Sequence, residues 1–425
     1  METCVRNVRK ELGIHLGREL AYGRKGSGLG VLVPIDKEHL ALYAALRVQQ
    51  CGILFLVENP KQMGVSMDTE NKDPYGGVAP LVSVIVPIYN CEAYIAQCLQ
   101  SLQNQTLPDF EALCVDDGSS DASLDCAKAA VAGDPRFHFD ALPENRGQSA
   151  ARNVALDKAT GEYLVLLDAD DYLVPEALEK LVVRAKSQQL DDLYFSGRSF
   201  YDGTESFRLV HEDYSARPSF EGVASGRELF TFFEEHDGFF PQAPLRMVRR
   251  DLVLEHGIRF FEGIIHEDLL FTLQTMLTSK RSSFLNEELY MRRVHMGSTM
   301  AQPRRTLANI RGHFVCMRWL QSWLDAHIEE LDRPFIKAIA HRMTAYRTMM
   351  EGDWYNDIDE ADQERFLAAL SNEELLDFLT SVIEPGYYVE EVYHSKTYQF
   401  GNTLVSAPRA LRDKAEEILR FRKER

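Results

Sequence analysis

The sequence has little positive charge for its length. Its 425 residues include 47 Lys and Arg against 65 Asp and Glu, which gives a formal net charge of −18. A general nucleic-acid-binding protein needs a basic surface to replace the counterions of the phosphate backbone. We therefore expect no nucleic-acid partner, although a local basic pocket for a small phosphate ligand remains compatible with this charge.

The sequence also lacks paired cysteines and long apolar segments. Its seven cysteines are scattered without a Cys-x-x-Cys pair, so they predict neither a disulfide framework nor a zinc site. No apolar run approaches the roughly 20 residues that a membrane-spanning helix needs. The first 20 residues contain no apolar segment typical of a secretory signal. These absences predict a cytoplasmic protein.

A glycine-rich nucleotide-binding motif is absent from its usual place. Gly26, Gly28 and Gly30 precede the first apolar run, whereas a dinucleotide fingerprint follows a strand and opens a helix. The residues up to 57 then contain two apolar runs around an amphipathic stretch, which resembles a short βαβ fragment. We treat 1–57 as an N-terminal accessory segment and the polar residues 58–79 as a linker.

Apolar runs alternate with helix-like segments from residue 80 onward. Strands are predicted at 82–88, 111–117, 136–142 and 162–168, and helices at 95–102, 119–133, 147–159 and 175–188. This alternation is typical of a mainly parallel α/β sheet flanked by helices. We predict such a domain at 80–300. A helical C-terminal domain is predicted at 301–425, with amphipathic segments at 304–330, 334–352 and 360–382.

Polar residues follow each of the four predicted strands. They are Pro87, Tyr89 and Asn90 after the first strand, 116–121 after the second, 144–148 after the third and 168–171 after the fourth. In open α/β sheets, ligands bind outside the carboxyl ends of the strands. We therefore expect these four polar segments to share one edge of the sheet and to form a ligand site there.

The four strand ends carry the motifs SVIVPIYN, VDDGSSD, ENRGQSAARN and GEYLVLLDADD. In this order and spacing they resemble glycosyltransferase family 2, which has the GT-A fold. The resemblance covers about residues 81–300, or about half of the chain. It implies a hexosyltransferase of the kind found in bacterial surface-polysaccharide synthesis. Such an enzyme transfers a sugar from a nucleotide-diphosphate sugar with inversion and uses a divalent cation.

The resemblance also implies a set of donor-binding residues. They are Pro87, Tyr89, Asp117, Asn145, Arg146, Arg152, Asp168 and Arg293. Within this set, Asp117 accepts the base N–H of uracil, which makes UDP the expected nucleotide. Arg146 and Arg152 contact the base or the diphosphate, although an ion pair with a nearby aspartate is an equally good interpretation of Arg152. Asp116 is interpreted as a turn residue.

A metal site is expected in the stretch 168–171. Mg²⁺ or Mn²⁺ would neutralise the charge that grows on the diphosphate leaving group, and both ions prefer oxygen ligands. By the motif match, Asp170 ligates the metal, while Asp168 lies by the ribose or contacts the metal through water. His295 is a further candidate ligand, with a surface histidine as the alternative. Asp171 is interpreted as the start of the next helix.

Inversion requires a base that deprotonates the acceptor hydroxyl group. The resemblance gives this role to Asp268, at the start of an amphipathic segment, with Glu267 as its support or as an acceptor contact. Compensation of the helix dipole is the alternative explanation of these two acids. No Gln-x-x-Arg-Trp element follows. We therefore expect addition of a single sugar, to a glycan or lipid-linked acceptor.

Several alternatives stay open at this point. The basic amphipathic segment 408–425 is compatible with peripheral contact on the inner face of a membrane, with packing against the chain, or with a homodimer. A nucleotidyltransferase shares this fold but would carry a Gly- and Lys/Arg-rich loop after the first strand. A catalytically silent nucleotide-sugar-binding protein is disfavoured by the presence of Asp168, Asp170 and Asp268.

Overall fold

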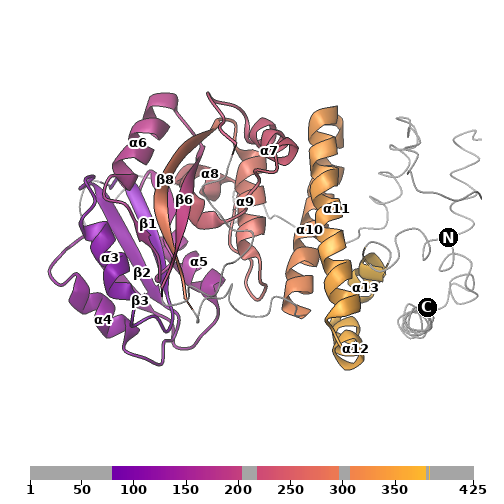
Figure 1. Cartoon of the computed structure of the whole chain (residues 1–425), viewed down its shortest axis with the longest axis horizontal. Helices are drawn as coiled ribbons and strands as arrows, with labels where there is room; N and C mark the ends of the chain where they lie inside the picture. Colours follow the sequence, from indigo (N-terminus) through magenta and orange to yellow (C-terminus); the bar gives the residue numbers. More distant parts are fainter. Residues whose placement is uncertain (1–78, 203–217, 296–306, 380–381, 383–425) are drawn as a thin grey trace, which may run out of the picture. The chain divides into compact units, whose positions relative to one another are not determined.

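The computed structural model describes residues 79–202, 218–295, 307–379 and 382, all of which belong to one compact unit (Figure 1). The predicted N-terminal segment 1–57, the linker up to residue 78 and the amphipathic tail 408–425 lie outside the described residues. The glycine-rich stretch 26–30 lies outside them too. The predictions for these segments stay predictions.

The described residues form one eight-stranded sheet in the order β3-β2-β1-β4-β7-β6-β8-β5. Its strands are β1 Val82–Ile88, β2 Phe110–Asp116, β3 Phe137–Ala141, β4 Tyr163–Leu166, β5 Tyr172–Leu173, β6 Asp192–Tyr201, β7 Arg246–Arg249 and β8 Ser282–Val294. The first four strands pair in parallel, as predicted. Strand β7 runs antiparallel to both of its neighbours, and β5 runs antiparallel to β8, so the second half of the sheet is mixed.

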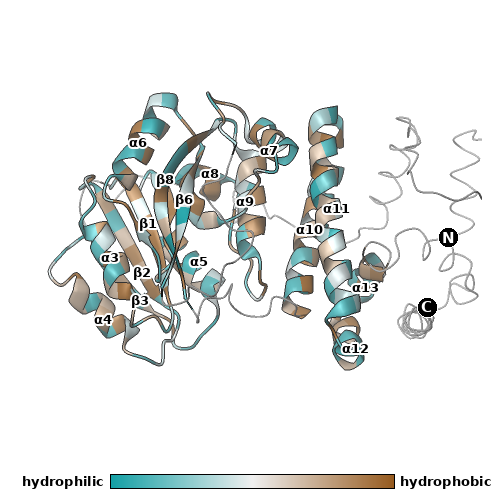
Figure 2. Ribbon diagram, viewed as in Figure 1, coloured by the Kyte–Doolittle hydropathy of each residue, from teal (hydrophilic) through white to brown (hydrophobic). Residues whose placement is uncertain are grey.

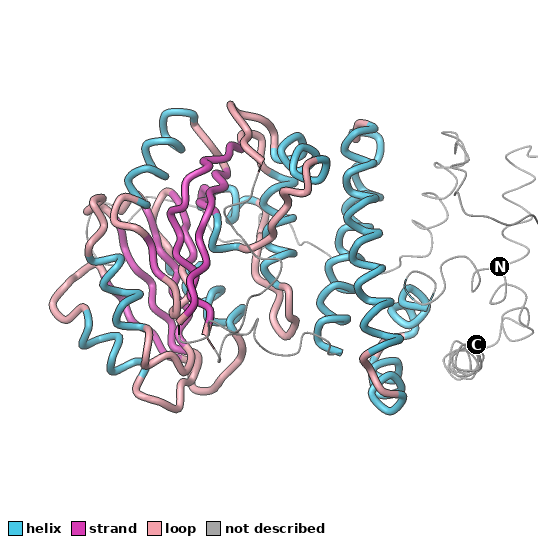
Figure 3. The backbone as a smooth tube through the Cα atoms, viewed as in Figure 1, coloured by secondary structure: helices cyan, strands magenta, loops and turns pink. Residues whose placement is uncertain are grey.

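Helices cover both faces of this sheet, which Figure 3 shows as one continuous layer of strands. Their bounds are α3 Ile95–Gln103, α4 Ser123–Ala130, α5 Gln148–Lys158, α6 Ala177–Gln188, α7 Gly226–Glu235, α8 Arg250–Glu255 and α9 Glu267–Thr278, with a short 3₁₀ helix η2 at Ala243–Leu245. Helices α3, α4 and α6 pack on one face, and α5, α8 and α9 pack on the other (Figure 1).

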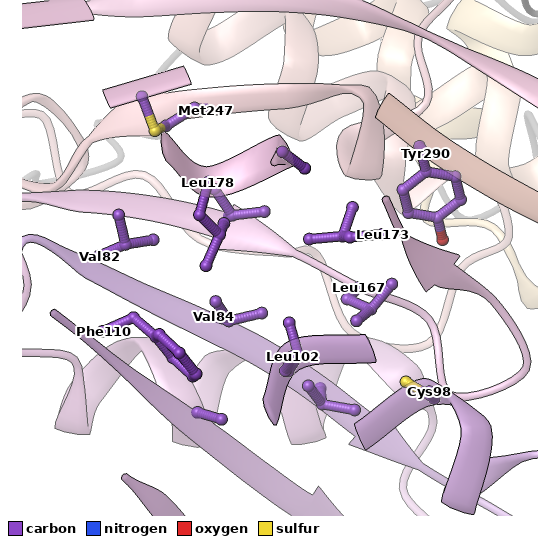
Figure 4. Close-up of a cluster of buried hydrophobic side chains, with 14 of the residues drawn as sticks. Val82, Val84, Cys98, Leu102, Phe110, Leu167, Leu173, Leu178, Met247 and Tyr290 are labelled. Atoms are coloured by element: carbon purple, nitrogen blue, oxygen red, sulfur yellow. The ribbon is translucent and has the colours of Figure 1, made fainter. Parts of the chain in front are cut away.

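The central strands explain why the sheet is covered on both sides. Every residue of β1, with the sequence VSVIVPI, is buried, because both faces of a parallel strand carry apolar side chains here. Val82 and Val84 face the cluster around Leu102 and Leu178 (Figure 4), whereas Ile85 faces the opposite cluster. Figure 2 shows apolar residues concentrated on these inner strands.

The C-terminal part is helical, as expected, but its last segment differs from the prediction. The helices are α10 Leu307–His327, α11 Arg333–Asn356, α12 Glu360–Ala369 and α13 Asn372–Phe378, with a 3₁₀ helix η4 at Ile328–Glu330. The prediction of one amphipathic segment at 360–382 is wrong, because these residues form two separate helices, α12 and α13. Ser371 causes the break by capping α13: its Oγ accepts from the Glu374 N–H at 3.2 Å, and the Glu374 carboxylate accepts from the Ser371 N–H at 2.9 Å. None of the described helices is long and apolar enough to cross a membrane.

A buried ion pair joins strands β6 and β7. The Arg246 guanidinium pairs with the Asp192 carboxylate, both side chains are fully buried, and Arg246 also lies 4.8 Å from the Tyr194 ring centroid. Burial raises the pKa of Asp192, against the opposing effect of the Arg246 charge. The Arg246 charge thus offsets part of the cost of burying the Asp192 carboxylate.

Removal of Arg246 tests this pair. Arg246→Met leaves the Asp192 carboxylate buried without its partner, so we expect the free energy of unfolding to fall by roughly 3–5 kcal/mol in urea denaturation. The control is Arg198→Met, which breaks the exposed Arg198–Glu288 pair between β6 and β8. We expect that change to cost about 1 kcal/mol or less. Equal losses in the two variants would contradict the assignment.

Candidate active site

Hydrogen bonds join the loops that follow β1, β2, β3 and β4. The Asn90 side chain accepts from the Ser120 N–H at 2.9 Å, which links the first loop to the second. The Asp117 carboxylate accepts from the Arg146 and Gly147 N–H groups, each at 2.8 Å, which links the second to the third. Gln148 then donates to Asp168 at 2.9 Å. The four polar segments therefore share one edge of the sheet, as the positions of the strand ends require.

The loop after β2 is fitted closely against the loop after β3. Gly118 has a φ of +68°, and a Cβ atom there would lie 2.7 Å from the backbone carbon of Glu144.

Both oxygens of the buried Asp117 carboxylate already accept backbone N–H groups, so a nucleobase N–H would have to use a remaining lone pair. The neighbouring Asp116 Oδ1 is buried and has no hydrogen-bond partner among the described residues. The sequence pattern indicates only a turn residue at Asp116 and gives no signal of this free acceptor.

The other expected donor-binding residues differ in exposure. Pro87 is buried at the end of β1, whereas Tyr89 is 48% exposed. The Asn145 side chain accepts from the Gly147 N–H at 3.0 Å, and the half-exposed Arg146 pairs with Glu262 at 2.9 Å. Binding of a nucleotide by these residues stays a prediction.

Arg152, in helix α5, joins the two acidic parts of the site. Its side chain is 1% exposed and pairs with Asp168 at 2.9 Å, Asp268 at 2.6 Å and Glu267 at 3.2 Å. Burial lowers the pKa of the guanidinium, but the charges of Asp268, Asp168 and Glu267 outweigh it and raise this pKa above its usual value. The structure thus shows Arg152 in ion pairs. It brings together Asp168 after β4 and the acidic pair at the start of α9.

Two of the carboxylates around Arg152, those of Asp168 and Glu267, have raised pKa values. Burial raises the pKa of Asp168 to about 6, although the Arg152 charge opposes this shift. Burial and the nearby Asp268 charge raise the pKa of Glu267 to about 7. A group with a pKa near neutrality can exchange protons at physiological pH, which is a property that active-site acids and bases share.

Asp170 and His295 form the second part of the site. The His295 Nε2 lies 3.1 Å from the Asp170 Oδ2, and the His295 ring packs 4.5 Å from the Tyr94 ring. The Asp170 carboxylate suits Mg²⁺ or Mn²⁺, which bind through one or two protein carboxylates plus substrate phosphates, and the His295 imidazole lies close enough to serve as a further ligand. Within the described ranges, no three His, Cys, Asp or Glu side chains are arranged to hold a metal by themselves. A cation here would therefore depend on donor oxygens for further ligands.

The interpretation of Asp171 as the start of a helix is wrong. Helix α6 begins at Ala177, and Asp171 is a buried acceptor that receives the Tyr290 hydroxyl and the Arg293 N–H, each at 2.6 Å. Burial raises the pKa of its carboxyl well above the usual range, with the nearby Asp170 charge as the next cause. Asp171 thus attaches the acidic loop to β8 instead of capping a helix.

Arg293 lies beside this loop with its donors engaged within the protein. The guanidinium bonds to Gln97, to Asp202 and to the Asp170 carbonyl oxygen, the last at 3.0 Å. The rings of Tyr94 and Phe200 lie on it at 4.9 and 4.8 Å. To reach a diphosphate, as the sequence suggested, Arg293 would have to exchange one of these partners. Gln97 and Asp202 were not predicted as part of this site, because no local sequence pattern indicates that they bond to Arg293.

The half-parallel sheet, with its acidic edge and a second acidic pair at a helix start, defines a GT-A-type glycosyltransferase. Residues 83–257 match the family described as Glycosyl transferase family 2. This part of the chain belongs to the family, and both the resemblance and the GT-A fold inferred from the sequence are confirmed.

Several known proteins are similar to this chain. YibD, a glycosyltransferase of Escherichia coli, is 27% identical over 272 residues, which cover 63% of this chain and 77% of the relative. The cholesterol galactosyltransferase of Borreliella burgdorferi is 31% identical over 227 residues, or 51% of this chain and 61% of that protein. The crystal structure of TarS 1–349 from S. aureus in complex with UDP-GlcNAc has a TM-score of 0.55 and 25% identity, and the match covers 71% of this chain and 81% of that one.

The raised pKa of Glu267 predicts how stability depends on pH. The unfolded chain releases the Glu267 proton near pH 4.5, whereas the folded protein keeps it until about pH 7. The folded state therefore loses stability as pH rises through this window. We expect the stability of the wild type relative to Glu267→Gln to fall by roughly 1–3 kcal/mol between pH 4.5 and 7.5, as measured by urea denaturation. Because Asp168 is present in both proteins, its own contribution to the pH dependence largely cancels in the difference. A pH-independent difference would contradict the assignment.

Proposed function

We propose that this chain transfers a single sugar from a UDP-sugar to a hydroxyl group of a glycan or lipid-linked acceptor, with inversion at the anomeric carbon. The main support is the Arg152 cluster, which holds Asp168, at the expected donor site, beside Glu267 and Asp268, the expected base pair. A single-sugar product agrees with the absence of a Gln-x-x-Arg-Trp element from the sequence.

Two relatives support the choice of substrates. The TarS neighbour was crystallised with UDP-GlcNAc, which favours UDP as the donor nucleotide. The cholesterol galactosyltransferase acts, by its name, on a lipid alcohol, which favours hydroxyl acceptors of lipid or glycan type. We further propose that the chain acts in surface-polysaccharide synthesis on the cytoplasmic side of a membrane. In this proposal residues 80–300 form the catalytic domain and residues 301–425 form a helical domain.

The proposed reaction is a displacement at the anomeric carbon. The acceptor oxygen forms a bond to this carbon while the bond to the diphosphate oxygen breaks, and the bonding electrons leave with the phosphate. Asp268 takes the acceptor proton. Its side chain is 27% exposed, against 14% for Glu267, so it is the acid that an acceptor reaches more easily. Arg152 orients the Asp268 carboxylate through the 2.6 Å bond.

Asp170 and His295 are the residues that would hold Mg²⁺ or Mn²⁺, with Asp168 contributing at the ribose or through water. The cation would neutralise the negative charge of the departing diphosphate. In this proposal Asp116, with its free buried oxygen, joins Asp117, Pro87 and Tyr89 around the uracil base. Asn145, Arg146 and Arg293 serve the base or the diphosphate.

The metal assignment is tested through donor binding. UDP with Mn²⁺ should raise the melting temperature of the wild type, and Asp170→Ala should abolish the metal-dependent part of this shift, because one of two protein ligands is gone. The control is Asp251→Ala, which removes an exposed carboxylate from α8, near the other end of β4. An unchanged Mn²⁺ effect in Asp170→Ala would exclude Asp170 as a ligand.

The base assignment is tested through turnover. A panel of UDP-sugars is first ranked by thermal stabilisation, and release of UDP from the best donor is then followed with and without acceptor sugars. Asp268→Asn keeps the size and polarity of the side chain, so we expect donor binding to be retained and the transfer rate to fall at least about 100-fold. Asp251→Asn should transfer normally. Appreciable turnover by Asp268→Asn would exclude Asp268 as the base.

A further inference from the structure

Helix α10 lies directly against the turn that precedes the proposed base pair. A Cβ atom on Gly312 would lie 1.9 Å from the Ile265 carbonyl oxygen and 3.3 Å from the His266 ring. No side chain larger than hydrogen fits between the helix and this turn. Gly312 therefore permits an approach of α10 that any other residue would prevent.

The turn has a conformation that needs support from its surroundings. His266, the residue before Glu267, has a φ of +71°, in the left-handed region that a side chain with a Cβ atom rarely adopts. Such a residue costs about 1–3 kcal/mol of local strain and persists only where neighbouring contacts hold it. The His266 carbonyl oxygen accepts from the Leu269 N–H in α9 at 3.1 Å and from the Cys316 thiol in α10 at 3.8 Å.

A stack of rings extends this contact into the helical domain. The His313 ring of α10 lies 4.1 Å from the His266 ring and 5.5 Å from the Tyr346 ring of α11, nearly parallel to both. Helix α11 is in turn attached to the sheet domain, because Arg342 pairs with the buried Glu234 of α7. The turn at His266 is thus held by two helices that are themselves fixed to the catalytic part.

We propose that Gly312 and His313 are positioning residues, which act through His266 to place Glu267 and Asp268 on Arg152. The helical domain then completes the active site instead of serving only as an attachment. The inference rests on the proposed function, in which Asp268 is the base. It goes beyond that function because it assigns a catalytic requirement to a helix that supplies no reacting group.

The test compares two glycine-to-alanine variants in the same helical domain. In Gly312→Ala, the new methyl group must move α10 or the 265–266 peptide. In the matched control Gly352→Ala, the Cβ atom meets nothing within 4 Å. We expect Gly312→Ala to lower kcat at least about tenfold while KM for the UDP-sugar changes less than about twofold. We also expect faster amide hydrogen exchange at the start of α9, including Leu269. Gly352→Ala should behave like the wild type in both measurements.

A second pair of variants covers the case in which Gly312→Ala fails to fold. His313→Ala removes the ring stack and should lower kcat, whereas His313→Phe retains a flat ring and should restore most of it. Wild-type kcat and exchange in Gly312→Ala, or equal kcat in His313→Ala and His313→Phe, would overturn the inference. Full activity of Asp268→Asn would instead overturn the proposed base. Hydrogen exchange at the start of α9 does not depend on which residue is the base, so it would still test whether α10 holds the turn. Failure of the base assignment can therefore be told apart from failure of the positioning role.

Discussion

The buried guanidinium of Arg152 is the group on which the arrangement of the active site depends. It lies within hydrogen-bond distance of three carboxylates, one after β4 and two at the start of α9. A buried cation is costly unless it is paired, and so are buried carboxylates that lie close together. The guanidinium and the three carboxylates therefore stabilise one another in the folded protein. This mutual requirement holds together two segments that are about a hundred residues apart in the sequence, and it leaves Asp168 and Glu267 with raised pKa values.

The antiparallel direction of β7 brings Glu267 and Asp268 to the same sheet edge as the loops that follow β1 to β4. Strand β7 runs antiparallel to β4, and Arg250 at its end bonds to Glu162 just before β4 begins. The chain must then return across the face of the sheet, through α8 and the segment 256–266, before α9 begins. The start of α9 lies near η2, at the opposite end of β7, where the Ala243 N–H donates to Asp268 at 3.4 Å. If β7 ran parallel to β4, an additional crossover segment would be needed to bring the start of α9 to this edge of the sheet.

The acidic loop after β4 and the turn before α9 are both held from outside the parallel part of the sheet. Asp171 attaches the loop to β8 through Tyr290 and Arg293. His266 packs against α10 through Gly312 and His313. The expected metal ligand Asp170 and the expected base Asp268 lie next to these attachments. The later part of the chain therefore contributes mainly by restricting residues that the earlier motifs supply.

The sequence by itself determined the parallel strands, the family and the edge on which the polar loops meet. These features follow from local patterns, since apolar runs such as 82–88 and 163–166 and the motifs after them need no knowledge of distant partners. It did not determine the partners of Arg152, the role of Asp171, the free oxygen of Asp116 or the contact between Gly312 and Ile265. Arg152 and Asp268 are 116 residues apart, and Asp171 and Tyr290 are 119 apart. Only the tertiary structure decided these pairings, because burial removes water as an alternative partner and leaves each polar group to be satisfied by whatever the fold brings beside it.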